Sequence, residues 1–322
     1  MTTPAIDIRG LVHTYKTDLF QKPRHALKGL DLAVEEGEIY GYLGTNGAGK
    51  TTTIKVLVGL LLQTAGAASI FGVDTRDVRA RTMVGFQPEN PYFYEYLTAR
   101  EALDFYAALS DLPRAERARR GAELLEFVGL AEAADARLGE FSKGMRQRLG
   151  IAQAVIHRPK LVILDEPMSG LDPMGRLQVR NIIMELHRQG LTVFFSSHIL
   201  SDVEMICSRV GLLLGGRLHA VGTVEALLGG GPVRSIDLIA ASLAPEQAKA
   251  LLPGNCDELP GMTFRFRCPD ETARDRVLRG ILDAGGQVLS VTPQRETLEE
   301  YFMRVNQVSR QEVGAWKGGA DA

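Results

Sequence analysis

The chain has 322 residues, enough for a large and a smaller domain, and its 45% hydrophobic and 24% charged residues are typical of a globular protein. Its 37 basic and 39 acidic residues give a formal net charge of -2, which excludes a general electrostatic attraction to nucleic acid or to an anionic membrane. Cys207, Cys256 and Cys268 are too few for a disulfide framework and have no metal-ligand spacing, so we expect buried thiols in a reducing cytosol.

The sequence predicts neither a secretory signal nor a transmembrane segment. Met1 to Arg9 contain no basic segment followed by an apolar core, as a signal peptide requires. The most apolar stretches, such as Val210 to Leu214, are far shorter than the roughly 20 residues that span a bilayer. If the protein acts at a membrane, we expect another chain to supply the spanning part.

Short apolar runs alternate with longer helical patterns through the first two thirds of the sequence. Strands are expected at Ile39 to Leu43, Leu161 to Leu164 and Thr192 to Ser196. This alternation is typical of an α/β fold, a mostly parallel sheet flanked by helices. Val210 to Leu214 and Arg217 to Val221 flank two glycines suited to a tight hairpin turn, so this hairpin is expected to close the first domain.

A helical insertion is expected after Glu89, where the strand signal stops. Thr98 and Glu101 have the capping-box spacing that begins a helix, and apolar residues follow at helical spacing. The insertion is expected to cover about residues 89 to 155. Just before the capping box, Pro91 to Tyr96 contain four aromatic residues. They could pack locally or form a docking surface, and the sequence favours neither.

A second, smaller domain is expected after residue 228. Gly229 to Pro232 have the composition of a linker, and 233 to 322 are expected to form an α+β domain. With one more short strand near Asp257, its order is that of a ferredoxin-like domain. The patterns predict strands at 233 to 239, 262 to 268 and 287 to 291, and helices at 245 to 252, 270 to 284 and 296 to 305.

A glycine-rich phosphate-binding loop follows the strand Ile39 to Leu43 and leads into the helical pattern Thr53 to Leu61. Glycines let backbone amides face the β- and γ-phosphates, and the helix N-terminus adds a favourable dipole. Lys50 is expected to neutralise γ-phosphate charge and the Thr51 hydroxyl to bind Mg²⁺. The ATP-binding residues are Gly44, Thr45, Asn46, Gly47, Ala48, Gly49, Lys50 and Thr51, which we name the phosphate loop, together with Thr52.

Two adjacent carboxylates, Asp165 and Glu166, follow the apolar strand at Leu161 to Leu164. Ligands bind at the C-terminal ends of strands in parallel sheets. Because neighbouring strand residues point to opposite sides, we expect Asp165 to hold the Mg²⁺ shell and Glu166 to orient or deprotonate the attacking water. Without the phosphate loop, such a pair is as often a helix-capping surface feature.

The order of further motifs resembles that of ATP-binding cassette (ABC) ATPases over Ile6 to Val224. Phe141 to Met145, Ser169 to Asp172, Gln87 and His198 stand in the family's order with the two nucleotide motifs. The resemblance implies a P-loop NTPase core with an antiparallel β portion and a helical insertion. It also implies that the chain is an ATPase.

The resemblance assigns roles to individual positions. Tyr15 matches the aromatic residue that stacks on adenine, Gln87 the residue that touches Mg²⁺ and senses the insertion, and His198 the switch that holds the γ-phosphate. Without the other motifs, Tyr15 could be an ordinary aromatic residue of a strand. Gln87 could be a surface glutamine, and His198 a histidine at the end of a strand. Ser142 and Gly144 match signature residues that reach the nucleotide of a second copy, and Asp172 belongs to the nucleotide site.

The signature departs from the common Leu-Ser-Gly-Gly-Gln, since Lys143 and Met145 replace a glycine and the glutamine. With the C-terminal extension ending near Phe302, this variant resembles the separate ATPase subunits of ABC type-2 exporters. That resemblance implies a homodimer on the cytoplasmic face of the membrane, bound to an integral membrane permease, with no nucleic acid partner. A soluble ABC ATPase that remodels nucleic acid or ribosomes is the alternative. The segment 233 to 322 could stabilise a dimer or bind a regulator.

Overall fold

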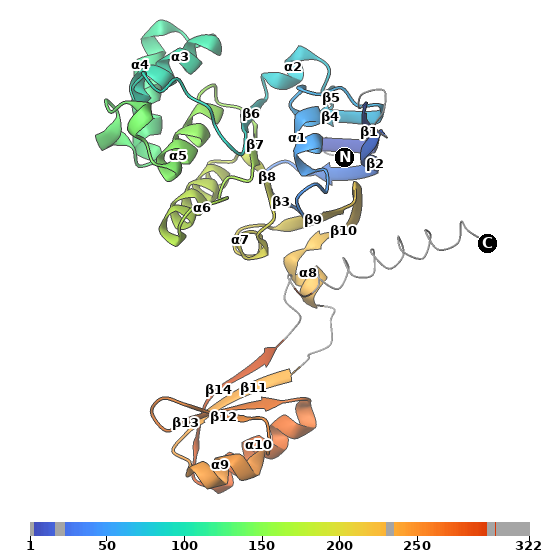
Figure 1. Ribbon diagram of the computed structural model, residues 1–322, viewed down its shortest axis with the longest axis vertical. Coiled ribbons are helices and arrows are strands. Elements are labelled where there is room, and N and C mark those ends of the chain that lie inside the picture. Colours follow the sequence, from blue (N-terminus) through green and yellow to red (C-terminus); the bar gives the residue numbers. More distant parts are fainter. Residues whose placement is uncertain (1–2, 17–22, 230–234, 295–299, 301–322) are drawn as a thin grey trace, which may run out of the picture. The chain divides into compact units, whose positions relative to one another are not determined.

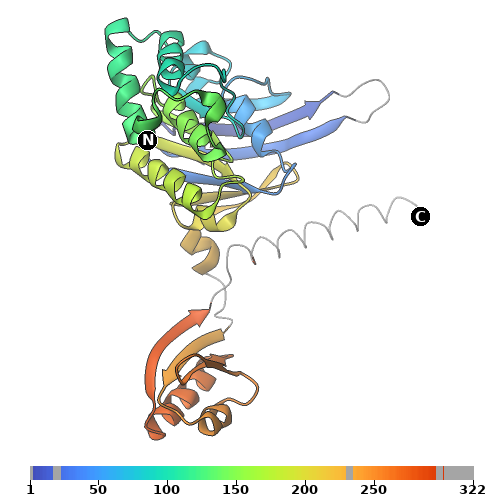
Figure 2. The same ribbon diagram turned by 60° about the vertical axis from the view of Figure 1, so that its left-hand side comes forward.

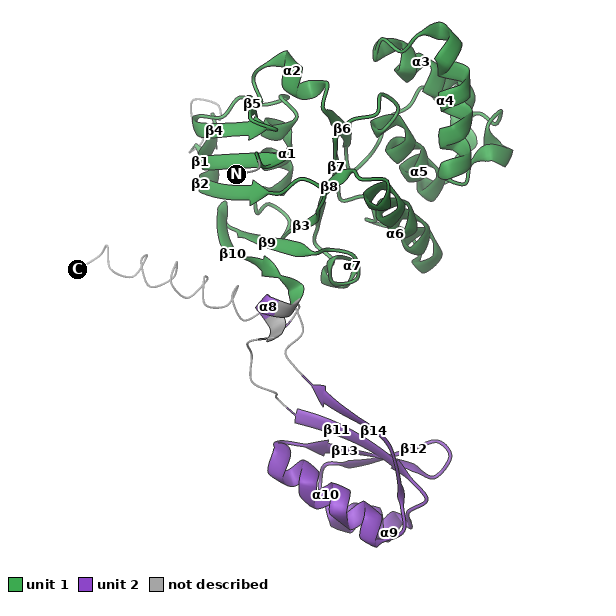
Figure 3. Cartoon of the chain, turned by 180° about the vertical axis from the view of Figure 1, so that it is seen from behind, with its two compact units in different colours: residues 1–224 green, residues 225–322 purple. Residues whose placement is uncertain are grey.

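The computed structural model describes residues 3–16, 23–229, 235–294 and 300 (Figure 1). The chain forms two compact units, residues 1–224 and 225–322, coloured separately in Figure 3. Each unit has its own sheet structure and its own hydrophobic core. Of the expected linker at 229–232, residues 230–232 lie outside the described residues.

The first unit is built on a six-stranded sheet of order β10-β9-β3-β8-β7-β6. All neighbouring strands are parallel except β9 and β10, which are antiparallel. Every residue of β3, β7 and β8 is buried, as expected for parallel strands covered on both faces. The strands are β3 (Ile39–Gly44), β6 (Val84–Gln87), β7 (Leu161–Asp165), β8 (Thr192–Ser197), β9 (Arg209–Leu214) and β10 (Arg217–Thr223).

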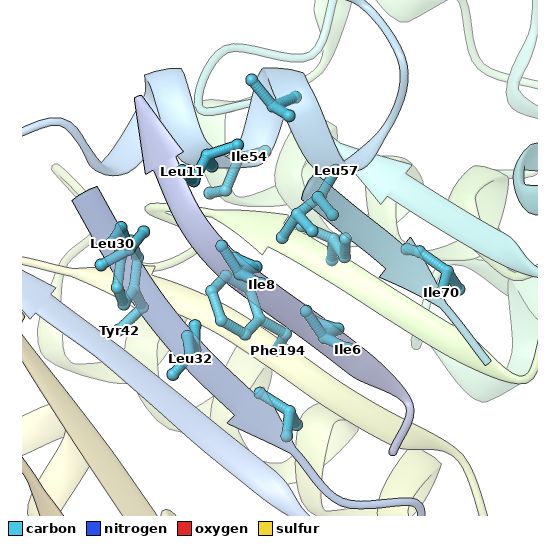
Figure 4. Close-up of a cluster of buried hydrophobic side chains, with 14 of the residues drawn as sticks. Ile6, Ile8, Leu11, Leu30, Leu32, Tyr42, Ile54, Leu57, Ile70 and Phe194 are labelled. Atoms are coloured by element: carbon cyan, nitrogen blue, oxygen red, sulfur yellow. The ribbon is translucent and has the colours of Figure 1, made fainter. Parts of the chain in front are cut away.

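A second, antiparallel sheet of order β2-β1-β4-β5 completes the core of this unit. Figure 4 shows Ile54 and Leu57 of helix α1 beside Ile8 of β1, in one apolar cluster that also contains Tyr42 and Phe194 of the parallel sheet. This packing fixes α1, and therefore the loop before it. The elements are β1 (Ile6–Tyr15), β2 (Arg24–Val34), α1 (Lys50–Leu57), β4 (Ala65–Ile70) and β5 (Val73–Asp74).

Helix α1 differs in its bounds from the predicted helical pattern at Thr53 to Leu61. It begins at Lys50 because the last residues of the phosphate loop form its first turn. It ends at Leu57, and Gly59 follows with a φ of 70°, a left-handed conformation that commonly terminates helices.

The expected hairpin turn lies against the phosphate loop. Gly215 and Gly216, between β9 and β10, have φ angles of 54° and 84°, as a tight hairpin turn requires. The Gly216 amide donates to the carbonyl of Ala48 at 2.9 Å, and its carbonyl accepts from the Lys28 amide at 2.9 Å. The hairpin is therefore confirmed, and it helps to hold the loop between β2 and the parallel sheet.

The helical insertion gathers on the side of the unit away from β1 and β2, as Figures 1 and 2 show. Its expected capping box is confirmed: Thr98 Oγ1 accepts from the Glu101 amide at 3.2 Å, and Glu101 Oε2 accepts from the Thr98 amide at 2.8 Å. The insertion contains α3 (Ala99–Leu109), α4 (Arg114–Phe127), η1 (Ala131–Ala133), η2 (Leu138–Glu140) and α5 (Lys143–Ala154). The other helices of the first unit are α2 (Val78–Arg81), α6 (Pro173–Arg188) and α7 (Leu200–Glu204), and α8 (Val224–Gly229) begins at the last residue of this unit.

The second unit has the ferredoxin-like βαββαβ order predicted from the sequence. Its antiparallel sheet has the order β12-β13-β11-β14, and α9 and α10 bury a core that includes Leu238, Phe266 and Val277. The predicted helix at 296–305 lies, apart from residue 300, outside the described residues. The elements are β11 (Ser235–Ala241), α9 (Pro245–Leu251), β12 (Cys256–Leu259), β13 (Thr263–Cys268), α10 (Glu271–Asp283) and β14 (Gln287–Gln294).

Among the described residues, no helix combines the length and the apolar character needed to span a bilayer.

Candidate active site

The phosphate loop turns from the end of β3 into α1 with two glycines in left-handed conformations. Gly47 has a φ of 80° and Gly49 a φ of 116°. A Cβ on Gly49 would lie 2.8 Å from the carbonyl oxygen of Ala26, so no larger residue fits there. Gly49 is also the N-cap of α1, and no side chain caps this helix. The first backbone amides of α1 therefore have no side-chain acceptor, which favours an anionic ligand.

A cavity of about 550 Å³ opens over this loop. Residues from the phosphate loop, the antiparallel sheet and the ends of two parallel strands line it together. They are Tyr15, Arg24, Ala26, Thr45, Asn46, Gly47, Gly49, Lys50, Thr51, Thr52, Glu89, Glu166, Ser169 and His198. Gly44 and Ala48 belong to the loop but are not among the lining residues.

Lys50 lies at the buried floor of this cavity, with 6% of its side chain exposed. Its Nζ donates to the carbonyl of Gly44 at 2.7 Å and lies 3.0 Å from Glu166 Oε1. The ammonium group is thereby held between the phosphate loop and the strand end that carries the two acids. A phosphate group on the loop amides would lie within reach of this cation.

Ser196 holds the backbone and side chain of the two acids. Its hydroxyl donates to Asp165 Oδ1 at 2.6 Å and accepts from the Glu166 amide at 3.0 Å. Burial raises the pKa of Asp165, while hydrogen bonds from Ser196 and Thr51 oppose the rise. The hydrogen bond from Thr51 places its hydroxyl next to the Asp165 carboxylate, so that two side-chain oxygens lie side by side.

The reason predicted for the different directions of the two acids is wrong. Strand β7 ends at Asp165, and Glu166 lies beyond it with a φ of 49°, in the left-handed region. The chain turn, rather than strand alternation, therefore directs the Glu166 carboxylate toward Lys50 and His198. A left-handed conformation is costly for glutamate and is commonly found at functional sites.

His198 follows β8 and contacts Glu166 twice. Its Nδ1 lies 2.7 Å from Glu166 Oε2, and its backbone amide donates to the same oxygen at 3.3 Å. The imidazole has 39% of its surface exposed, whereas the Glu166 side chain is 8% exposed. The histidine thus lies at the mouth of the cavity and the glutamate beneath it.

Tyr15 lies at the rim, where the adenine-stacking residue was expected. Its hydroxyl is 3.2 Å from Thr52 Oγ1, and its ring packs against the His13 imidazole in an edge-to-face arrangement with the centroids 4.6 Å apart. These contacts fix the tyrosine next to the first turn of α1. An aromatic face beside a phosphate site suits a nucleoside base.

The structure does not bring Gln87 to the cavity. Gln87 is fully buried as the last residue of β6, and its Nε2 donates to the backbone carbonyl of Gln147 in α5 at 3.1 Å and to the Gln147 side chain. Pairing of Gln87 with Leu164 of β7 fixes this direction. Glu89, two residues later, lines the cavity instead. Gln87 contacts the helical insertion, as expected, and is not among the residues that line the cavity.

Ser142, Gly144 and Asp172 line a different cavity of about 380 Å³. Ser142 caps α5 by accepting from the Met145 amide at 3.2 Å, and Asp172 caps α6 by accepting from the Gly175 amide at 3.1 Å. Within one chain, the predicted nucleotide residues therefore divide between two separate cavities. Ser169 lines the first cavity and Asp172 the second, so one short loop joins them.

Four lining residues, Arg24, Ala26, Glu89 and Ser169, were not predicted as site residues. Ser169 belongs to the motif Ser169 to Asp172, in which the resemblance assigns a role only to Asp172. Glu89 could have been suspected because it is the first acidic residue after a strand of the parallel sheet. Arg24 has no motif, since only its pairing with Tyr15 across β1 and β2 brings it to the cavity.

Known proteins share both the sequence and the fold. The family model described as ABC transporter matches residues 27–169. An uncharacterized ABC transporter ATP-binding protein of Synechocystis is 39% identical over 313 residues, which cover 90% of this chain and 81% of that protein. The bacitracin transport ATP-binding protein BcrA of Bacillus licheniformis is 44% identical over 295 residues, covering 86% of this chain and 90% of BcrA.

A solved structure of the ATP-binding subunit of an ABC transporter superposes with a TM-score of 0.61 and 34% sequence identity. The match covers 69% of this chain and 91% of that subunit. The P-loop NTPase fold predicted from the sequence is therefore confirmed.

Proposed function

The chain belongs to the family of ABC transporter ATP-binding proteins, and from this premise we propose that it hydrolyses ATP to drive export through a separate membrane permease. The observation that carries the catalytic part is the contact of Glu166 with both Lys50 and His198 in the cavity over the phosphate loop. A cation, a carboxylate and an imidazole converge there on the place where a γ-phosphate would bind. A relative named for bacitracin transport and the Ser-Lys-Gly-Met signature variant support the transporter assignment.

The proposed reaction is in-line attack of water on the γ-phosphate. Glu166, held between Lys50 and His198, orients this water and takes its proton. His198 keeps the carboxylate in place and donates to the γ-phosphate. Lys50 and the amides of the phosphate loop neutralise the charge on the transferred group, so positioning and charge stabilisation supply most of the catalysis.

The residues at the end of β7 fit a magnesium ion. Thr51 and Asp165 offer hard oxygen ligands in direct contact, as Mg²⁺ prefers. We propose that Glu89, which lines the cavity, replaces Gln87 as the third protein group near the ion. Among the described residues no three His, Cys, Asp or Glu side chains cluster, so phosphate and water oxygens would supply most ligands. When bound, Mg²⁺ neutralises charge on the β- and γ-phosphates.

We propose that the nucleotide site is completed by a second copy of the chain. Ser142 and Gly144 lie at the start of α5 in their own cavity and do not line the cavity over the phosphate loop of the same chain. A hydroxyl and backbone amides at a helix N-terminus suit a γ-phosphate. Two copies facing each other would therefore hold two ATP molecules between phosphate loops and signatures.

The permease would bind an exposed group of aromatic residues in the first part of the insertion, which we name the aromatic patch: Tyr92, Tyr94, Tyr96 and Phe105. Tyr92 and Tyr96 are 80% and 69% exposed, an unusual state for large aromatic side chains. Glu95, between them, accepts from Arg146 of α5 at 3.2 Å. Through this contact, a movement of the aromatic patch would also displace α5, which begins at the signature residues Ser142 and Gly144. This arrangement would place the protein on the cytoplasmic face of the membrane.

ATP binding and hydrolysis by the purified wild-type chain and by Lys50→Ala test the catalytic part. We expect the wild type to turn over ATP and the variant to lose nucleotide affinity. Retained affinity in Lys50→Ala would mean that the phosphate loop is wrongly assigned. Purification from membranes tests the transport part: an integral membrane chain should co-purify, whereas recovery with ribosomes or DNA would contradict it.

A further inference from the structure

Arg24 lies at the rim of the nucleotide cavity without a role in the mechanism above. It is the first residue of β2 and pairs directly with Tyr15, the last residue of β1. Directly paired residues of antiparallel strands project to the same face of the sheet. The guanidinium therefore lies on the same side as the tyrosine ring, and both line the cavity.

The guanidinium reaches the apex of the phosphate loop. A Cβ built on Gly47 would lie 3.5 Å from Arg24 Nη2, which is ordinary van der Waals contact. Gly47 has a φ of 80°, so its backbone is held in the shape that turns amides toward a ligand. Lys50 approaches the same loop from the buried floor, whereas Arg24 is exposed. Lys50 is thus the buried cation of this cavity and Arg24 an exposed one.

Arg24 has no partner among the described residues. No hydrogen bond or ion pair to it exists in that part of the chain, whereas Lys50 is bound to Glu166 and to the Gly44 carbonyl. The carboxylates among the cavity's lining residues belong to Glu89 and Glu166. A nucleoside triphosphate carries about four negative charges, and a planar guanidinium can bind two phosphate oxygens at once. The position of Arg24 at the cavity and its lack of a carboxylate partner among the described residues both favour an anionic ligand.

We propose that Arg24 binds the phosphate chain of the nucleotide from the solvent side and selects nucleoside di- and triphosphates over nucleosides. The inference rests on the proposed ATP site and adds a residue to it. Tyr15 would hold the base and Arg24 the phosphates, from two paired positions of one β-hairpin. The nucleotide would then lie between the rim and the buried Lys50.

The test compares affinities for ATP, ADP and adenosine in Arg24→Gln and the wild type. The measurements use full-length protein with EDTA, which prevents hydrolysis. We expect Arg24→Gln to bind ATP and ADP about tenfold more weakly than the wild type does, because a hydrogen bond from a charged group is lost. Its affinity for adenosine should equal that of the wild type. Arg24→Lys should recover part of the affinity, since it keeps the charge but not the paired donors. Because Arg24 is exposed and has no hydrogen bond or ion pair with another described side chain, thermal melting should show unchanged folding.

Two controls separate this proposal from the proposed function. Arg188→Gln removes another exposed positive charge, which is paired with Glu185 of α6 outside the cavity, and should bind all three ligands as the wild type does. Failure of the wild type to bind ATP would refute the proposed function itself. If the wild type binds ATP and Lys50→Ala does not, unchanged ATP affinity in Arg24→Gln overturns only the role of Arg24. Equal weakening for adenosine also overturns it, because Arg24 would then act through Tyr15 on the base.

Discussion

His198 binds Glu166 through both its ring and its backbone, with Nδ1 at 2.7 Å and the amide nitrogen at 3.3 Å from the same carboxylate oxygen. The other oxygen of Glu166 lies 3.0 Å from Lys50 Nζ. The carboxylate therefore bridges the end of β8 and the phosphate loop. A group held on both sides is suited to orienting a water molecule, and its removal should affect turnover more than binding.

Glu166→Gln should bind ATP with nearly wild-type affinity and lose at least about 100-fold in turnover. The amide keeps the size of the carboxylate but cannot take a proton from water, which is a general-base effect of this order. The variant should accumulate as an ATP-bound dimer in size-exclusion chromatography. Glu185→Gln, in the last turn of α6 and outside the cavity, is the matched control. Unchanged turnover in Glu166→Gln would contradict the assignment.

His198→Ala should lower kcat by about 100-fold, comparable with the loss of one transition-state donor, and change KM much less. The loss has two parts, since the ring contacts both Glu166 and the proposed γ-phosphate position. The double variant with Glu166→Gln should therefore be only slightly worse than Glu166→Gln alone, because residues that act as a unit are not additive. Steady-state kinetics measures kcat and KM of the wild type, the two single variants and the double variant. Fully additive losses would mean that the two residues act independently.

Gln87 and Glu89 should respond differently to substitution. Gln87→Ala removes a buried donor to α5 and should cost about 1–3 kcal/mol of unfolding free energy. Glu89→Gln should leave stability unchanged and raise the Mg²⁺ concentration needed for half-maximal ATPase activity, because a carboxylate at the cavity is lost. Denaturant unfolding and Mg²⁺ titration measure the two effects. The reverse pattern would restore Gln87 as the residue near the metal.

Local sequence rules were sufficient where neighbours along the chain determine the structure. The glycine pair at Gly215 and Gly216 and the capping box of Thr98 and Glu101 both depend on residues a few positions apart. The phosphate loop is local in the same sense. Its strand, its glycines and its helix follow one another directly, so both fold and anion-binding character could be predicted.

Long-range pairing decided the features that the sequence did not reveal. The direction of Gln87 depends on its pairing with Leu164, and the position of Arg24 depends on the register of β1 and β2. Ser196 joins Asp165 and Glu166 from a strand 30 residues away along the chain. Such contacts are fixed by strand order and register, which hydrophobic patterns in a single sequence do not specify.

The second unit offers a test of the hypothesis that residues 233–322 stabilise a dimer. Its own core means that removing it should leave the first unit folded. Strand β14 is an edge of its sheet, and Leu289 and Val291 on it are 52% and 41% exposed. An exposed apolar edge strand is a common site of pairing with another chain.

We therefore expect the chain without residues 233–322 to be monomeric in the absence of ATP, at concentrations where the full chain is dimeric. The same truncated chain carrying Glu166→Gln should dimerise when ATP is added. A second contact would keep two copies close while the nucleotide sites open. Leu289→Lys in the full chain should reproduce the effect of truncation, and Leu282→Lys, on the exposed side of α10, is its control. Analytical ultracentrifugation with and without ATP measures both. A truncated chain as dimeric as the full one would assign residues 233–322 to regulation instead.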